Sequence, residues 1–253
     1  MRLLWHAVPA IAAAALIAGC GGSGSPAAGG GPSATPTTIA PPENGVATLP
    51  GAQILTRAKA ALAKATSVHV VGSLPGAGAE LRFDVRIRGT AGGYGAISLD
   101  NHKLEVIRIA QTAYLRGDEK FWVSEIGNAS LAKRLAGRYV KASVNDPQLN
   151  QLVAFTNVAT LADMLPKAGL PLTKRGRTVV DGVLTMALSD DDPTERGTVY
   201  VALQGQPYPV RLSATDAKTK ASTSIDFTDY NRPVTLRAPK LSQIIDAKTL
   251  GGS

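Results

Sequence analysis

A single cysteine, Cys20, is the residue of this 253-residue chain whose type and position most clearly point to chemistry. It follows an almost uninterrupted apolar run over residues 3–18, with the positive charge of Arg2 before it. The run is too short and too rich in alanine to span a membrane comfortably, and it is typical of a secretory signal peptide. A thiol is readily alkylated to a stable thioether, and the small residues before Cys20 leave room for a peptidase. The sequence therefore predicts a processed and modified N-terminus.

The stretch Leu16-Ile17-Ala18-Gly19-Cys20 resembles the bacterial lipobox, in which an aliphatic residue stands three positions before a cysteine. The resemblance implies that the Cys20 sulfur receives a diacylglyceryl group, that a peptidase cuts between Gly19 and Cys20, and that the new amine is open to acylation. Two or three acyl chains hold a protein at a membrane durably, whereas one holds it only marginally. We therefore expect a lipoprotein signal peptide over residues 1–19 and a mature chain anchored on the extracytoplasmic face of the cell membrane. The alternative is an ordinary secretory signal with a cysteine there by chance.

The other residues that could bind a metal or act in catalysis are not spaced for either. His69 falls in an expected strand and His102 in a hairpin turn, with no cysteine partner and no H-x-x-x-H spacing. The triplet Asp190–Asp192 lacks the spaced ligands and distal glutamate of an EF-hand, so a solvated loop is the simpler interpretation. The chain has no G-x-S-x-G elbow, no Walker loop and no G-x-G-x-x-G between a strand and a helix. We therefore expect no metal, no cofactor and no catalytic residues, and predict that the protein is not an enzyme.

The chain is basic, with 27 Lys and Arg against 19 Asp and Glu and a formal charge of +8. Loss of Arg2 with the signal peptide leaves +7 on the mature side chains. Export argues against nucleic acid as the partner of these charges. The cations are scattered, with small concentrations near residues 133–141 and 174–177, which favours ordinary solvated faces. Attraction to an anionic membrane surface is the alternative interpretation.

Residues 21–50 are a low-complexity mixture of Gly, Ser, Pro and Thr, which cannot bury enough apolar surface to offset the entropy of ordering. We expect residues 20–51 to be the lipidated N-terminus and a flexible tether, residues 52–240 one folded domain, and residues 241–253 a tail. About 30 such residues span roughly 30 Å on average and stretch to about 100 Å. The domain is large enough to form an apolar core without disulfides.

Apolar periodicity predicts the elements of the first half of the domain. A helix is expected over residues 52–65, where Ile54, Leu55, Ala58 and Leu62 recur at helical spacing. Residues 80–88 alternate strictly between apolar and polar, which is typical of a strand with one buried and one wet face and favours antiparallel pairing. The other strands expected in this meander are residues 68–71, 94–99, 103–110, 112–116 and 121–123.

The pattern then changes to helices and returns to strands. The expected helices are residues 128–140, 147–155 and 159–165, with a break near Asn157 and a stop near Pro166. This order of elements predicts an α+β fold, in which helices cover a long antiparallel sheet. The strands expected after the helices are residues 172–177, 178–189 with a turn near Asp181-Gly182, 198–203, 209–214 and 222–229.

Four features of the domain, two of them pairs of stretches, stand out by residue type and order. They are the helix-to-strand step Ala60–Val70, the pair Ala113–Leu115 and Phe121–Val123, the pair Val180–Val183 and Leu203–Arg211, and the segment Phe227–Val234 with Pro239 after it. In this order, and together with the lipobox, they resemble the actinobacterial lipoproteins of the LppX/LprG type, whose fold is similar to that of the LolA/LolB lipoprotein carriers. The resemblance covers about residues 52–240.

This resemblance implies a LolA-like fold, a strongly curved antiparallel sheet that forms a half-open barrel with helices plugging its mouth. In that family the cavity between sheet and helices holds acyl chains of lipids or lipoglycans. An apolar sheet face must meet a helix, a lipid tail or both, and in sequence a packed core and a cavity wall look alike. Only a strand rich in small residues, such as Gly92–Ala96, hints at open space. The candidate cavity-lining residues are Leu81, Phe83, Val85, Ile87, Ile97 and Leu99.

We therefore expect a membrane-anchored lipoprotein of the cell envelope that binds or carries the acyl chains of a lipid or lipoglycan. Burial of apolar area, at about 25 cal/mol per Å², would supply the affinity. The alternative is a sensor or regulatory module that uses the same fold to contact a membrane protein, which would have a filled core and an exposed apolar patch. A hydrolase is the third candidate and would need a polar cleft with convergent titratable groups.

Overall fold

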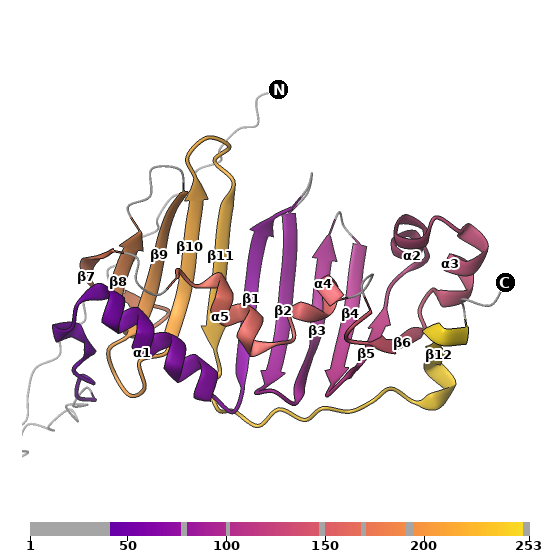
Figure 1. The fold of residues 1–253 in the computed structure, drawn as a ribbon, viewed down its shortest axis with the longest axis horizontal. Helices are drawn as coiled ribbons and strands as arrows, with labels where there is room; N and C mark the ends of the chain where they lie inside the picture. The colour runs from indigo at the N-terminus through magenta and orange to yellow at the C-terminus, as the bar shows by residue number, and fades with distance from the viewer. Residues whose placement is uncertain are drawn as a thin grey trace, which may run out of the picture. The chain divides into compact units, whose positions relative to one another are not determined.

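The computed structural model of the chain describes residues 41–76, 80–99, 102–146, 150–167, 171–190 and 195–249. The chain divides into two compact units, Met1–Ala40 and Pro41–Ser253, and all described residues belong to the second. Within that unit a large sheet carries helices on one face (Figure 1). Gly19 and Cys20, the predicted cleavage and lipidation positions, lie outside the described residues.

The strands of the described chain form one open sheet, built from two meanders that meet at its centre. They run in the order β12-β6-β5-β4-β3-β2-β1-β11-β10-β9-β8-β7, so the first meander spans β1 to β6 and the second β7 to β11. The strands are β1 (Val68–Pro75), β2 (Glu80–Arg88), β3 (Gly92–Leu99), β4 (His102–Ile109), β5 (Thr112–Arg116), β6 (Tyr139–Ser143), β7 (Leu172–Val180), β8 (Val183–Asp190), β9 (Glu195–Ala202), β10 (Pro209–Asp216), β11 (Ser222–Thr228) and β12 (Ile244–Asp246).

The predicted α+β fold, with a curved antiparallel sheet under helices, is confirmed. Every strand pair is antiparallel except β12 with β6, which pair in parallel. The sheet ends at β7 on one side and β12 on the other, so it does not close into a barrel. Gly95 of β3 permits a close approach of two strands, because a Cβ atom there would lie only 2.7 Å from the Cα of Val85 in β2.

Helices α1, α4 and α5 lie across the same face of the sheet, and α2 and α3 lie beside β5 (Figure 1). In α1, Ile54, Leu55, Ala58 and Leu62 are buried at helical spacing, as the sequence predicts. This apolar stripe packs the helix onto the sheet. The helices are α1 (Gly51–Lys64), α2 (Glu119–Ile126), α3 (Ala129–Leu135), α4 (Asn150–Ala154) and α5 (Val158–Met164), with short 3₁₀ turns at Val46–Thr48, Leu241–Gln243 and Ala247–Thr249.

The prediction of a strand at residues 121–123 was wrong, because these residues lie in α2. The Asp118 side chain accepts a hydrogen bond from the backbone N–H of Phe121 at 2.7 Å and so caps the helix. Gly127, with φ of 65°, ends it. A run of three apolar residues does not by itself distinguish strand from helix, so the capping residues decide the structure here.

The single helix predicted over residues 128–140 is instead a short helix followed by a strand. Asn128 caps α3 by accepting from the N–H of Leu131 at 3.0 Å, and the helix ends at Leu135. Gly137 has φ of 71°, which turns the chain back so that Tyr139 opens β6. The predicted break near Asn157 is confirmed, since Asn157 caps α5. The predicted strand boundary between residues 177 and 178 is absent, because β7 continues to Val180.

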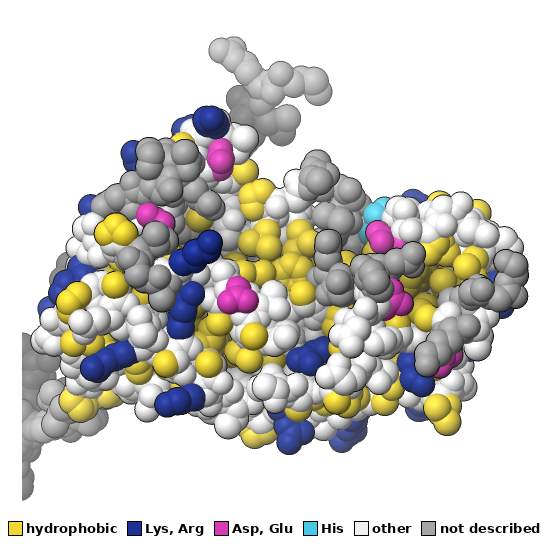
Figure 2. Space-filling view, in the orientation of Figure 1, with side chains coloured by type: hydrophobic (Ala, Val, Ile, Leu, Met, Phe, Trp, Pro, Cys, Tyr) yellow, Lys and Arg dark blue, Asp and Glu magenta, His cyan; other side chains and the backbone are white. Residues whose placement is uncertain are grey.

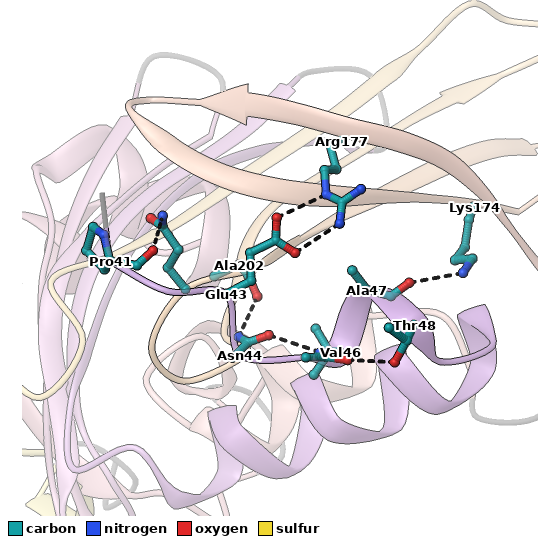
Figure 3. A network of polar contacts seen from close by, with 11 residues as sticks. Pro41, Glu43, Asn44, Val46, Ala47, Thr48, Lys174, Arg177 and Ala202 are labelled. Carbon is teal, nitrogen blue, oxygen red and sulfur yellow. Dashed lines mark hydrogen bonds and ion pairs between the residues drawn. The ribbon is translucent and has the colours of Figure 1, made fainter. Parts of the chain in front are cut away.

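Residues 41–48 are fastened to the second meander by polar contacts (Figure 3). The Arg177 guanidinium of β7 donates two hydrogen bonds to the Glu43 carboxylate, at 3.0 and 3.1 Å. The Asn44 amide donates to the Ala202 carbonyl at 3.1 Å, and the Lys174 amine donates to the Ala47 carbonyl at 3.1 Å. The described part of the chain therefore packs on the sheet from about ten residues before α1.

The segment after β11 crosses to the far edge of the sheet and ends in β12 (Figure 1). Tyr230 fastens its beginning: its ring stacks on Tyr208 with centroids 3.9 Å apart, and its hydroxyl donates to the Pro209 carbonyl at 2.8 Å. Burial raises the pKa of Tyr230 well above its ordinary value. At the far end, Ile245 of β12 pairs with Val140 of β6, so residues 244–246 belong to the sheet.

Candidate functional site

One face of the sheet, the inner face, carries apolar side chains from neighbouring strands and is the face that the helices cover (Figure 1). On β2 it presents Phe83, Val85 and Ile87, none more than 3% exposed. The register sets Val70 of β1 opposite Val85, and Ile97 of β3 opposite Phe83, so the apolar rows continue across strands. Because it is apolar over several strands, the inner face is where an acyl chain could be bound.

The structure brings five of the six predicted lining residues to the inner face. Four of them, Phe83, Val85, Ile87 and Ile97, are buried members of one continuous apolar cluster. Leu81 is half-buried and packs against that cluster. The backbone of Leu99 ends β3, but its side chain lies outside the described part of the structure.

The link between α4 and α5 forms the cover over the middle of the inner face. The ring of Phe155 lies on the ring of Phe83, with centroids 4.9 Å apart and planes tilted by 32°. Thr156 is fully buried and stands over Gly93 of β3, where an added Cβ atom would lie 3.2 Å from the Cβ of Thr156. The space that a side chain at Gly93 would occupy is therefore filled by the cover.

Arg108 of β4 donates three hydrogen bonds, and two of them hold this cover. Its Nε donates to the Thr156 hydroxyl at 3.1 Å, a terminal nitrogen donates to the Thr156 carbonyl at 2.9 Å, and the other donates to Ala110 O at 3.4 Å. The Thr156 hydroxyl in turn donates to the Val153 carbonyl at 2.6 Å. Burial lowers the pKa of Arg108 from its ordinary value, but the guanidinium remains charged at neutral pH. A charged clamp thus ties the helical cover to an otherwise apolar face.

Toward the upper ends of β11, β1 and β2, hydrophobic side chains are visible in a hollow on this face (Figure 2). Leu74 of β1 pairs with Leu81 of β2 at that end, and both are half-buried. Phe155 is half-buried as well, and all three pack against the main apolar cluster. The apolar surface of the inner face therefore continues past the cover to a place where solvent reaches it.

The opposite, outer face of the sheet is polar. Two neighbouring depressions of about 480 and 380 Å³ lie on it, and both are lined by Asp84 and Lys103. Nε2 of His69 lies 2.7 Å from Oδ1 of Asp84, and its Nδ1 lies 3.6 Å from Asp229. The charges on this face are largely matched to one another, and charged side chains line both depressions, so an acyl chain there would have to displace their water.

Glu105, Arg116 and Tyr139 form a second polar cluster, where β4, β5 and β6 lie side by side. Arg116 donates to one Glu105 oxygen at 2.5 and 3.1 Å, the Tyr139 hydroxyl donates to the same oxygen at 3.0 Å, and the guanidinium lies 4.7 Å from the Tyr139 ring centre. Burial acts to raise the pKa of Glu105, but the hydrogen bonds from Arg116 and Tyr139 outweigh it and leave the pKa below its ordinary value.

Sequence analysis did not single out Arg108, Phe155 or Thr156. For Arg108 a signal exists, because Leu104, Val106 and Arg108 share one face of a strand, and a charge in such a row marks an unusual site. Phe155 and Thr156 carry no comparable signal. Their role depends on how the link between α4 and α5 packs against β2, β3 and β4, which local periodicity does not encode.

Among the described residues, no three His, Cys, Asp or Glu side chains come together in a way that could hold a metal ion. Asp191 and Asp192 of the acidic triplet lie outside the described residues. In the same part of the chain, no helix has the length and apolar character needed to cross a membrane.

No family model and no curated protein matches the chain. Among solved structures, it is similar to the lipoprotein LppX of Mycobacterium tuberculosis, at 17% identity and a TM-score of 0.48, over 74% of this chain and 98% of that one. LprF of Mycobacterium bovis is similar at 18% identity and a TM-score of 0.47, over 75% and 96%. A conserved protein of Thermus thermophilus is similar at 13% identity and a TM-score of 0.40, over 77% and 97%. These proteins are what the chain is similar to at low identity, and nothing about family, ligand or activity follows from the similarity.

Proposed function

We propose that the protein is a lipoprotein, anchored through Cys20, whose inner face binds the acyl chains of an envelope lipid or lipoglycan. The observation that carries this proposal is that the apolar cluster extends to Leu74, Leu81 and Phe155, which are only half-buried, so solvent reaches this part of the inner face. Figure 2 shows hydrophobic side chains in a hollow toward the upper ends of β11, β1 and β2. An acyl chain laid there would cover apolar surface that is otherwise wet, at about 0.8 kcal/mol for each buried methylene. The role needs no catalytic step.

The helical cover fits this proposal, because the contacts that hold it on the sheet can break and re-form. The ring of Phe155 lies on the ring of Phe83, and Arg108 holds Thr156 through exchangeable hydrogen bonds. Movement of Phe155 away from Phe83 would extend the hollow along β2 toward the buried part of the apolar cluster. The lipid tail would then take the place of the protein's own aromatic side chain.

Lipid extraction tests the proposal. The mature protein is purified from an actinobacterial host, extracted with organic solvent and analysed by mass spectrometry, which leaves covalent thioether-linked lipid on the protein. We expect about one acyl-bearing lipid per chain. A Leu81→Glu variant should lose most of it, since a carboxylate in the hollow opposes an apolar tail. The matched control is Val179→Glu, at a position that is 64% exposed on β7. No lipid from the native protein, or equal recovery from both variants, would refute acyl-chain binding.

The anchor is tested separately. Cys20→Ala should move the protein from membranes washed in high salt, which releases electrostatic contacts, to the soluble extracytoplasmic fraction, because the side chain that would carry the thioether is gone. Ser25→Ala in the same segment is the control and should leave fractionation unchanged. Mass spectrometry of the N-terminal peptide measures the added acyl mass directly. If the Cys20→Ala protein still sediments with membranes, another feature holds it there.

A protein-binding module without a lipid ligand is the second candidate, and the close packing of the inner face favours it. Phe83, Val85, Ile87 and Ile97 are each at most 3% exposed, so the protein's own side chains already fill the middle of the face. Cross-linking in intact membranes would then recover a membrane protein, while extraction would recover no lipid. The two experiments together separate the candidates.

A further inference from the structure

The segment that follows β11 runs along the border of the sheet that is formed by the lower ends of its strands. Figure 1 shows residues 229–241 running past the lower ends of β1 to β5 before η2 (Leu241–Gln243) and β12. The segment is tied to the end of α1: Asn231 accepts from the Thr66 N–H at 2.9 Å, and the Arg232 carbonyl accepts from the Ser67 hydroxyl at 2.5 Å. Pro233 and Pro239 restrict its backbone. It is therefore a fixed border of the domain.

Exposed cations follow this border. Half-buried Val234 and Leu236 alternate with exposed Thr235 and Arg237, so the apolar side chains face the protein and the charge faces solvent. Figure 2 shows Lys and Arg side chains gathered along the same edge. Five exposed residues form this basic rim: Lys64 at the end of α1, Arg88 at the end of β2, and Arg232, Arg237 and Lys240 of the segment.

The basic rim has no compensating carboxylates among the described residues. None of its five side chains forms an ion pair there, whereas neighbouring acidic groups are already engaged. Asp229 lies 3.6 Å from His69, and Asp246 lies 3.4 Å from the Lys141 amine. The rim is therefore a row of like charges along one border, which gives that border a positive potential that attracts an anionic surface.

Leu241 stands directly after the rim and is 89% exposed, the most exposed large apolar side chain of the described chain. Its backbone is fixed, because the adjacent Ser242 carbonyl accepts a hydrogen bond from the Arg138 guanidinium at 3.1 Å. A solvated leucine beside a row of cations is the arrangement of a peripheral membrane contact, in which the cations meet lipid headgroups and the leucine enters the acyl boundary.

We propose that the basic rim and Leu241 rest on the anionic surface of a phospholipid bilayer. Each cation brought near such a surface strengthens binding by about fivefold, and the attraction falls as salt screens it. The contact would orient the sheet with its lower border against the bilayer. It does not depend on a lipid ligand at the inner face or on acylation of Cys20.

A polarity-sensitive fluorophore at position 241 tests the contact. The full-length chain with Cys20→Ser and Leu241→Cys is labelled and mixed with vesicles of phosphatidylglycerol or of phosphatidylcholine. We expect a blue shift with phosphatidylglycerol, its loss in 0.5 M salt (about 4 Å of screening length), and no shift with phosphatidylcholine. The control carries the label at Val179→Cys, which is exposed on β7 and should not shift. Equal shifts in both lipids, at both positions, or no shift at all would overturn the proposal.

Charge reversal gives a second, independent readout. Arg232→Glu, Arg237→Glu and Lys240→Glu together should raise the phosphatidylglycerol concentration at half-maximal shift by more than tenfold. All three side chains are exposed, so the thermal melting of the variant should match that of the parent. An unchanged half-maximal concentration in a variant that melts normally would exclude the rim as the contact.

Discussion

Arg108 occupies a position where the alternation of its strand predicts an apolar side chain. Partly burying a guanidinium without a carboxylate is costly unless its N–H groups find acceptors. Here the acceptors all belong to neutral groups, two of them on Thr156. Thr156 of the helical cover therefore supplies acceptors that stabilise the Arg108 guanidinium, and Arg108 in turn holds the cover in place. At this scale the sequence does reveal the unusual residue, but not the partner that satisfies it.

Arg108→Ala should loosen the cover more than it unfolds the sheet. Loss of the bonds to Thr156 leaves a buried hydroxyl and carbonyl with fewer partners, which we expect to cost about 1–3 kcal/mol in the free energy of unfolding. Hydrogen exchange of residues 150–165 should speed up by more than that of β2. Arg86→Ala on the outer face, 42% exposed and 3.7 Å from Asp84, is the control and should cost under about 0.5 kcal/mol. Equal effects of the two substitutions would contradict the clamp.

Glu105 gives the domain a pH dependence of defined sign. Its pKa is lower in the folded state than the ordinary value of 4.5, so its ion pair stabilises the fold above about pH 4.5 and is lost as pH falls through the folded-state pKa. Because the side chain is 38% exposed, we expect only about 1 kcal/mol at pH 7. Glu105→Gln should show this deficit in urea unfolding at pH 7 and lose most of it at pH 3. A deficit that stays constant with pH would mean that the charge does not matter.

At the scale of elements, capping residues determine whether a segment is a helix or a strand where its apolar periodicity fits both. The alternating pattern of residues 80–88 predicts β2 to the residue, and Asp181-Gly182 predicts the β7–β8 turn, where both residues have positive φ. Phe121–Val123 is too short for its period to be read, and Asp118 before it is the usable signal. Tyr139 and Val140 show the converse: they continue a helical pattern, but Gly137 stops it and pairing with β5 makes them a strand.

Asp118→Ala tests the cap of α2. It removes the acceptor of the Phe121 N–H, so we expect a loss of about 1 kcal/mol in the free energy of unfolding. The pKa of Asp118 is held below its ordinary value by that backbone hydrogen bond, so the loss should shrink in acid. Glu125→Ala, exposed in the last turn of the same helix, should leave stability nearly unchanged and serves as the control in thermal unfolding. A larger effect at Glu125 than at Asp118 would show that the cap is not what holds α2.

For the molecule as a whole, the sequence predicts the class and the existence of most strands but not how the two meanders join. Neighbouring strands in the chain pair with each other, which local turns dictate, whereas β1 and β11 pair across more than 150 residues. Nothing in Val68–Val71 specifies Phe227 rather than another apolar strand as its neighbour. The candidate site could not be predicted in full for the same reason, because the inner face is continuous only when β1 and β11 pair.

The position of β1 and β11 at the centre has a consequence for synthesis. A ribosome that has made the chain through Asp216 has supplied every strand up to β10, yet the flank of β1 and the flank of β10 are still bare, since the strand that fills the gap is made next. Both unpaired flanks present free N–H and carbonyl groups beside apolar side chains. Such strand edges promote aggregation of nascent chains. Translation of residues 217–228 is thus the interval in which both flanks are exposed and in which a chaperone would protect them.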